Sequence, residues 1–316
     1  MTSLGAGGVT TLGGGGGGER GRMTTVEVRP GLDSGPLPAS SAQAVADACA
    51  VRLALVSPPR TGSTPVARML WQHDAVTHHC HEPFEAGYWG GRGVISVWQN
   101  LACPMEVASG SRIPLSRVPP ASGLLVKEMT FQLDAGQFLF LAGLATAPVV
   151  FVMRDPRLST ASRLRIVREL YGEVSFPPFE SGWQSLAEQV RLCERHGIDY
   201  VIVDSADMRA NSAGVASALL KALRLPAQPE LDSWSPRPGL QLCSPQVGAL
   251  MSEKRADDDP FYRRVLSSDG IQPADVIDWS RESALIRSAG LADDLAAWTE
   301  LYEQLRADPN RLRAEP

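Results

Sequence analysis

Short apolar runs alternate with amphipathic helical patterns along the middle of the chain, and this alternation constrains the fold more than any other feature. The apolar runs, each bounded by turn residues, are Val51–Val56, Leu124–Met129, Val149–Met153 and Tyr200–Val203. The helical patterns are Ser63–His73, Asp134–Ala145, Pro156–Tyr171, Trp183–His196 and Ala213–Leu223. Strands and helices in alternation predict an α/β fold with a mainly parallel sheet flanked by helices. Ligands of such sheets bind at the carboxyl ends of the strands, so function is sought in the loops that follow the apolar runs.

The two ends of the chain differ from this middle part. Residues 1–45 are rich in Gly, Pro and Ser and predict a flexible tail and linker, because they carry too little apolar surface to offset the entropy of ordering. Met23 is an alternative start. Residues 46–316 predict one domain, whose strand signal is lost from about residue 226. Helical segments near Asp258–Ser267, Ser280–Ser288 and Leu291–Leu305 there predict a helical C-terminal cap.

Charge and cysteine usage exclude several classes of protein. The 316 residues carry a formal net charge of −5, whereas proteins that bind a phosphate backbone usually display a basic excess. The five cysteines form no C-x-x-C pair, which favours a reducing compartment and disfavours a zinc knuckle. The N-terminus lacks the apolar stretch of a secretory signal. We therefore expect a cytoplasmic protein with no nucleic-acid or membrane partner.

One uncharged segment, Gly136–Met153, has the length of a short membrane span. Gly143, Thr146 and Pro148 interrupt it, so a helix followed by a buried strand is the better interpretation.

The loop after the first apolar run has the composition of a phosphate-binding loop. It reads Ser57-Pro-Pro-Arg60-Thr61-Gly62-Ser63-Thr64 and leads directly into a helical pattern. A helix N-terminus offers backbone N–H groups and positive dipole density to an anion, while Arg60 adds a planar charged donor. An ordinary strand-to-helix turn with a Ser/Thr cap is the alternative. The lysine of a G-x-x-x-x-G-K-[ST] nucleotide loop is missing, which disfavours a nucleoside triphosphate.

A second such loop follows the strand Val149–Met153. It reads Arg154-Asp155-Pro156-Arg157 and is followed by LSTASRLR, which places Ser162 on the next helix. Arg154 and Ser162 are candidates to hold a second phosphate beside the first. The alternative is that Asp155 caps the helix while Arg154 pairs with a carboxylate.

The two loops together resemble those of sulfotransferases that use 3′-phosphoadenosine 5′-phosphosulfate (PAPS). The stretches HEPFE, VKEM and FYRRVLSSDGIQP, at residues 81–85, 126–129 and 261–273, also resemble bacterial members. The resemblance implies a P-loop-like sulfotransferase fold, PAPS as co-substrate and no metal. It places Arg60, Thr61, Gly62, Ser63 and Thr64 at the 5′-phosphosulfate, and Arg154 and Ser162 at the 3′-phosphate. Many relatives have Lys where Arg60 stands.

Sulfuryl transfer needs a base for the acceptor proton and cations for the charge on the leaving phosphate. Glu82 is our candidate base, with His81 as its rival, and helix capping or pairing with an arginine is the structural alternative. Arg60 and Lys127 are the candidate cations, although Lys127 is equally suited to a salt bridge with Glu128 or Glu82. The run His78-His79-Cys80-His81 is no metal site by our interpretation, because neighbouring side chains on a strand point to opposite faces.

Four aromatic residues follow Glu82 among glycines and are candidates for an acceptor-binding loop or for the core. They are Phe84, Tyr88, Trp89 and Trp98. The sequence thus predicts a sulfotransferase that acts on a hydroxyl or amine of a small molecule. The alternatives are an ATP-dependent P-loop phosphotransferase or kinase, and a non-catalytic nucleotide-binding protein.

Overall fold

The computed structural model describes most of the chain beyond its N-terminal part. The described residues are 46–47, 49–76, 78–82, 84–85, 88, 105–106, 122–236, 239–243, 251–255, 260–274 and 276–314. They belong to one compact unit, Asp33–Pro316. The predicted tail and linker, Trp89 and Trp98 lie outside the described residues.

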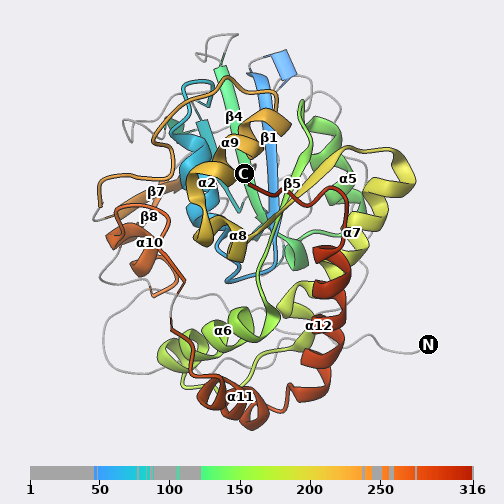
Figure 1. The fold of residues 1–316 in the computed structure, drawn as a ribbon, viewed down its shortest axis with the longest axis vertical. Helices are drawn as coiled ribbons and strands as arrows, with labels where there is room; N and C mark the ends of the chain where they lie inside the picture. The colour runs from blue at the N-terminus through green and yellow to red at the C-terminus, as the bar shows by residue number, and fades with distance from the viewer. Residues whose placement is uncertain are drawn as a thin grey trace, which may run out of the picture. The chain divides into compact units, whose positions relative to one another are not determined.

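A six-stranded sheet forms the centre of this unit, in the order β3-β2-β4-β1-β5-β6 (Figure 1). Its strands are β1 (Cys49–Ser57), β2 (His78–His81), β3 (Met105–Glu106), β4 (Ser122–Met129), β5 (Val149–Met153) and β6 (Tyr200–Asp204). All neighbours pair in parallel except β2 with β3, which pair antiparallel. This architecture confirms the predicted α/β class and its mainly parallel sheet.

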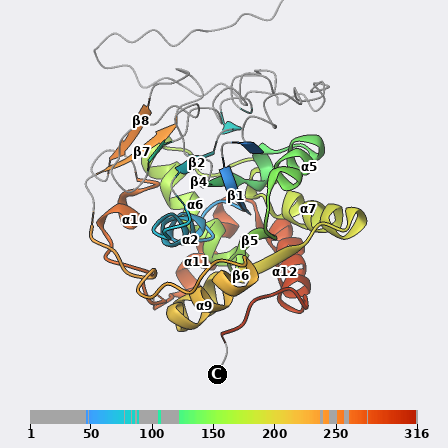
Figure 2. The same ribbon diagram turned by 90° about the horizontal axis from the view of Figure 1, so that it is seen from above.

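Helices cover both faces of the sheet, as Figure 2 shows from above. The helices of the described residues are α2 (Ser63–Trp71), α5 (Ala135–Leu144), α6 (Pro156–Tyr171), α7 (Trp183–His196), α8 (Ser205–Ala210), α9 (Ser212–Ala222), α10 (Arg263–Ser267), α11 (Trp279–Ser288) and α12 (Ala292–Arg306), with 3₁₀ turns at Thr130–Gln132 and Pro178–Ser181. Of these, α11 packs on α6. Because side chains alternate along a strand, Leu53 and Leu55 pack with α2 and α9, whereas Ala54 and Val56 pack with α5 and α7.

Three features of the sheet region were missing from the predicted apolar runs. The pattern of β2 is four polar or small residues, HHCH, and β3 is only two residues long, so neither carries a strong strand signal. The region after residue 226 is not purely helical either. It contains an antiparallel pair, β7 (Gly239–Cys243) and β8 (Met251–Arg255), which corrects the expectation that the strand signal ends there. The helices α10, α11 and α12 confirm the helical remainder.

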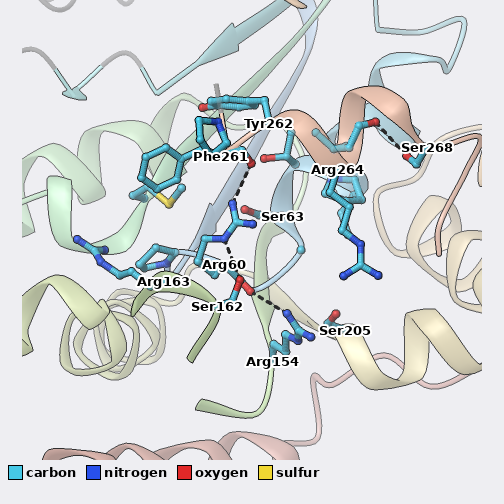
Figure 3. A pocket seen from close by; sticks show the side chains of 18 of the residues that line it. Arg60, Ser63, Arg154, Ser162, Arg163, Ser205, Phe261, Tyr262, Arg264 and Ser268 are labelled. Carbon is cyan, nitrogen blue, oxygen red and sulfur yellow. Dashed lines mark hydrogen bonds between the residues drawn. The ribbon is translucent and has the colours of Figure 1, made fainter. Parts of the chain in front are cut away.

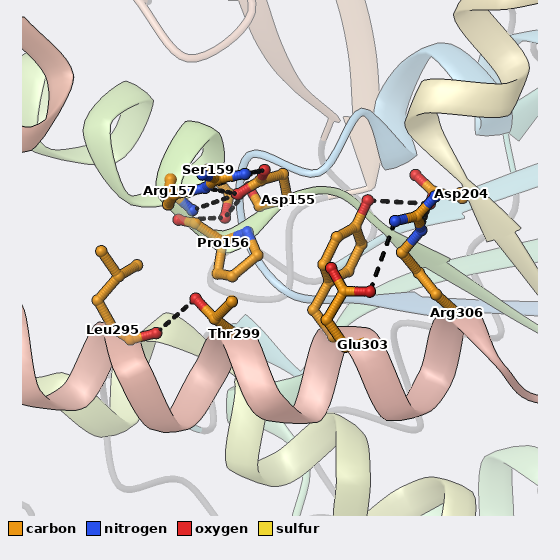
Figure 4. Close-up of polar contacts among 10 residues, drawn as sticks. Asp155, Pro156, Arg157, Ser159, Asp204, Leu295, Thr299, Glu303 and Arg306 are labelled. Carbon is orange, nitrogen blue, oxygen red and sulfur yellow. Dashed lines mark hydrogen bonds and ion pairs between the residues drawn. The ribbon is translucent and has the colours of Figure 1, made fainter. Parts of the chain in front are cut away.

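The C-terminal segment extends the sheet beyond β6. Ile202 N–H donates to Asn310 O at 3.0 Å, and Leu312 N–H donates to Ile202 O at 2.8 Å, so residues 310–312 lie parallel to β6 at the sheet edge. Before this segment, α12 is fastened to the carboxyl end of β6, where the hydroxyl of Tyr302 donates to Asp204 Oδ2 at 3.0 Å. Figure 4 shows Arg306 of the same helix between Asp204 and Glu303.

Candidate functional site

A cavity of about 420 Å³ opens at the carboxyl ends of the parallel strands, where the sequence placed the phosphate-binding loops. One end is lined by arginines and hydroxyl groups from the segments that follow β1, β5 and β6 and from α10. The other end is lined by Glu82 and Glu85 with mainly apolar neighbours. We call these the donor end and the base end, after the roles that the sequence resemblance implies for them. The donor-end residues are Arg60, Gly62, Ser63, Thr64, Arg154, Ser162, Ser205, Arg209 and Arg264.

The loop after β1 forms the floor of the donor end. Gly62 has a φ of +91°, and α2 begins at the next residue with no side-chain cap. The first helical hydrogen bond runs from Val66 N–H to Gly62 O, so the helical pattern supplies no acceptor for the N–H groups of Ser63 and Thr64. An anion is a suitable partner for them. The hydroxyl of Thr61 is used differently: it is buried and donates to Pro58 O at 2.9 Å within the loop.

Arg60 connects this loop to two other segments (Figure 3). Its Nε donates to Ser162 Oγ at 3.3 Å, and its Nη1 donates to Phe261 O at 2.9 Å. Arg154 approaches from the end of β5, with its Nη1 3.5 Å from Arg60 O. The two loops therefore meet, as their places at neighbouring strand ends predict. Asp155 caps α6 by accepting from Arg157 N–H at 2.9 Å, so the capping part of the alternative interpretation also holds.

Several donor-end residues were not singled out from the sequence. Ser205 directly follows β6, and a Cβ at Gly62 would lie 3.2 Å from its Oγ. Arg209 Nε donates to Ser205 Oγ at 3.4 Å, one turn along α8. The rule that ligands sit after parallel strands would have found Ser205, because it follows the apolar run Tyr200–Val203. Arg264 lies within the stretch FYRRVLSSDGIQP, which was noted only for its resemblance.

At the base end, β2 and β4 bring Glu82, Lys127 and His81 together. The Lys127 ammonium is fully buried and hydrogen-bonds the Glu82 carboxylate at Oε1, and Nε2 of His81 lies 3.1 Å from the same oxygen. Burial alone would raise the pKa of Glu82, but Lys127 and His81 outweigh it and hold that pKa below the usual range. Glu82 lines the cavity, whereas Lys127 lies behind it and pairs with Glu82. A contact of Lys127 with a sulfonate oxygen stays a prediction.

The neighbouring carboxylate Glu128 has a different environment. Its two oxygens accept from Phe84 N–H at 2.8 Å and Met129 N–H at 2.7 Å, so it fixes the backbone that follows Glu82. Complete burial and the adjacent Glu82 charge raise the pKa of Glu128 well above its usual value. Of the two buried carboxyls, Glu82 is therefore the one held as the anion.

Backbone strain marks both ends of the cavity. Arg60 has a φ of +64° and Glu82 a φ of +50°, in a region that side chains other than Gly seldom adopt. Such conformations cost about 1 to 3 kcal/mol each and cluster at functional sites. The Glu82 backbone is held there by its N–H, which donates to Lys127 O at 2.7 Å. Nothing in the sequence signals this strain.

The aromatic candidates of the acceptor loop take two places. Phe84 is buried in the core, while the half-buried Tyr88 packs its ring edge-on against Phe131 at 5.1 Å between centroids. Phe131 lines the cavity and also packs on Arg163, which donates to Glu180 O at 2.7 Å.

Among the described residues there is no group of three or more His, Cys, Asp or Glu suited to a metal ion. No helix in this part of the chain is long and apolar enough to span a bilayer.

Comparisons with known proteins give no match to a family model and none to a curated protein. Among solved structures, the chain is similar to mouse sulfotransferase SULT7A1 complexed with PAP, with a TM-score of 0.40 and 14% identity over 79% of this chain and 88% of that one. It is also similar to the sulfotransferase domain of the Synechococcus PCC 7002 olefin synthase, with a TM-score of 0.45 and 15% identity over 80% and 94%. Both are sulfotransferases, the family that the loops resemble. At these identities and scores, the function proposed below rests on the residues of the cavity.

Proposed function

We propose that the protein is a sulfotransferase that moves the sulfuryl group of PAPS to a hydroxyl or amine of a small-molecule acceptor. The observation that supports this most is one cavity that joins an arginine-rich donor end to the Glu82 carboxylate. Its volume of about 420 Å³ lies within the range of small-molecule sites.

The donor end suits a nucleotide with two separate anionic groups. The 5′-phosphosulfate would lie on the N–H groups of Ser63 and Thr64 with the guanidinium of Arg60, and the 3′-phosphate would lie between Arg154 and Ser162. Charged hydrogen bonds of this kind are the strong ones in proteins, and they need no metal. The contact between Arg60 and Ser162 supports two proposed anion sites that lie side by side.

In the transfer, the acceptor oxygen attacks the sulfur and forms a new O–S bond while the S–O bond to the 5′-phosphate breaks. The acceptor proton goes to the Glu82 carboxylate, and the electron pair stays on the departing adenosine 3′,5′-bisphosphate. Arg60 would stabilise the charge that appears on the bridging oxygen. Lys127 and His81 hold Glu82 ionised, and with its strained backbone they fix it at the cavity wall.

Two measurements test the proposal. Calorimetric titration with adenosine 3′,5′-bisphosphate should show one site per chain, and mass spectrometry of an extract incubated with protein and isotopically labelled PAPS should reveal a sulfated product. Thermal stabilisation by ATP–Mg²⁺, with none by the bisphosphate, would contradict it and favour a phosphotransferase.

A further inference from the structure

The hydroxyl of Tyr262 lies against the imidazole of His81, although the two residues are 181 positions apart. Oη of Tyr262 is 2.8 Å from His81 Nε2, and the two rings pack edge-on with centroids 5.4 Å apart. The same nitrogen lies 3.1 Å from Glu82 Oε1. These short contacts link Tyr262 through His81 to Glu82, and both rings are buried.

The donor end fixes the place of Tyr262. Its neighbour Phe261 accepts a hydrogen bond from Arg60 through its carbonyl, at 2.9 Å. Three residues further on, Val265 O accepts from Arg68 Nη1 of α2 at 2.6 Å. Figure 3 shows Phe261 and Tyr262 together above Arg60. The segment that carries Tyr262 is thus held by the same helix and loop that form the floor of the donor end.

The hydrogen bonds of His81 Nε2 depend on whether this nitrogen carries a proton. If Nε2 carries a proton, that N–H is shared between the Glu82 carboxylate and the Tyr262 oxygen. If Nε2 carries none, it accepts from the Tyr262 hydroxyl and faces the carboxylate with its lone pair, which is unfavourable. The Tyr262 hydroxyl therefore influences how strongly His81 binds Glu82.

Other charged and titratable groups face His81 from each packed element. On β2 itself, the ring of His79 lies 5.2 Å away, and burial, together with the His81 and Lys127 charges, lowers the pKa of His79 well below its usual value. From β4, Lys127 contacts Glu82, and Glu128 accepts a hydrogen bond from Phe84 N–H. His79 is therefore held neutral, and His81 is the imidazole of this pair whose ring nitrogen contacts Glu82 and Tyr262.

We propose that Tyr262 is a positioning residue for Glu82 and acts through His81, so that the segment over the donor end also sets the state of the base. The inference rests on the proposed function, in which Glu82 accepts the acceptor proton. Tyr262 need not touch the acceptor or the sulfur for this role.

The first test is spectroscopic and needs no acceptor. In Tyr262→Phe, the ¹⁵N resonances of His81 and the ¹³C carboxyl titration of Glu82 should both shift relative to the wild type. Tyr200→Phe is the matched control, because Tyr200 is as buried as Tyr262, at 8% exposure, and its hydroxyl donates to Asp308 outside the cavity. That variant should shift neither signal. An unchanged Glu82 titration in Tyr262→Phe overturns the proposal.

The second test asks whether Tyr262 acts through His81. In a His81→Asn background, which lacks Nε2, the added change Tyr262→Phe should leave the Glu82 titration unmoved. A further shift of the size seen in the single variant would mean that Tyr262 acts by another route, and would overturn the proposal.

The third test is kinetic, with PAPS as donor and 4-nitrophenol as acceptor. Tyr262→Phe should lower kcat about three- to tenfold, the effect of one hydrogen bond, with little change in affinity for the bisphosphate. A loss of bisphosphate affinity with unchanged kcat contradicts the inference alone. A wild-type protein that neither binds the bisphosphate nor consumes PAPS contradicts the proposed function, and the spectra still decide the link between Tyr262 and Glu82.

Discussion

The donor end and the base end of the cavity use charge in opposite ways. At the donor end, Arg60, Arg154 and Arg264 line the cavity, where Arg60 hydrogen-bonds Ser162 Oγ and Phe261 O and Arg154 lies 3.5 Å from Arg60 O. At the base end, Lys127 and His81 are buried and contact the Glu82 carboxylate directly. Three arginines therefore gather at the donor end, as the proposed binding of an anionic nucleotide requires. At the base end, Lys127 and His81 contact the Glu82 carboxylate without any ligand. These contacts keep the buried Glu82 ionised.

The largest expected effect comes from the base end. Glu82→Gln should lower kcat about 10²- to 10⁴-fold, because it removes the group that accepts the proton. Affinity for the bisphosphate should change little, since the donor end is untouched. Rates of PAPS consumption with 4-nitrophenol, together with calorimetry, separate the two effects. Glu188→Gln, an exposed site on α7, is the control. Full activity in Glu82→Gln would remove the base assignment and make His81 the candidate.

A smaller and more selective effect is expected at the donor end. Arg154→Ala should weaken bisphosphate binding about 10- to 100-fold, as for the loss of a charged hydrogen bond. Binding of adenosine 5′-phosphosulfate, which lacks the 3′-phosphate, should fall much less. Arg165→Ala on the exposed side of α6, where Arg165 pairs with Glu282, controls for loss of charge. Equal losses for both nucleotides would show that Arg154 does not hold the 3′-phosphate.

The smallest effect concerns the floor of the donor end. Gly62→Ala and Gly197→Ala both place a side chain at positive φ, and each should lower the free energy of unfolding by about 1 to 3 kcal/mol. Only at Gly62 does the added methyl approach another group, Ser205 Oγ at 3.2 Å, while Gly197 has open space around it. Bisphosphate affinity should therefore fall only in Gly62→Ala. Denaturant unfolding and calorimetry measure the two quantities, and equal affinities would argue against a ligand at this loop.

The difference between the donor end and the base end also explains which parts of the site could be predicted from the sequence. The donor loops follow β1 and β5, whose apolar runs are visible locally, so the sequence could predict that the loops of Arg60 and Arg154 meet. Glu82, His81 and Lys127 were also named from the sequence, with a salt bridge between Lys127 and Glu82 as one alternative. How the three meet depends on β2, whose HHCH pattern lacks an apolar run, and on its pairing with β4, in which His81 lies opposite Lys127. The contact of His81 with Tyr262 spans most of the chain. Pairing over such distances leaves no periodic signal, and neither does the positive φ of Glu82.

The C-terminal segment gives the site an unexpected dependence on the last residues of the chain. Asn310 and Leu312 supply the hydrogen bonds that cover the outer edge of β6, and Ser205 of the cavity follows that strand directly. Truncation before residue 310 would leave the β6 edge with open backbone groups, a common starting point for aggregation. For expression of the protein, an intact C-terminus is therefore a matter of solubility as well as of the shape of the donor end.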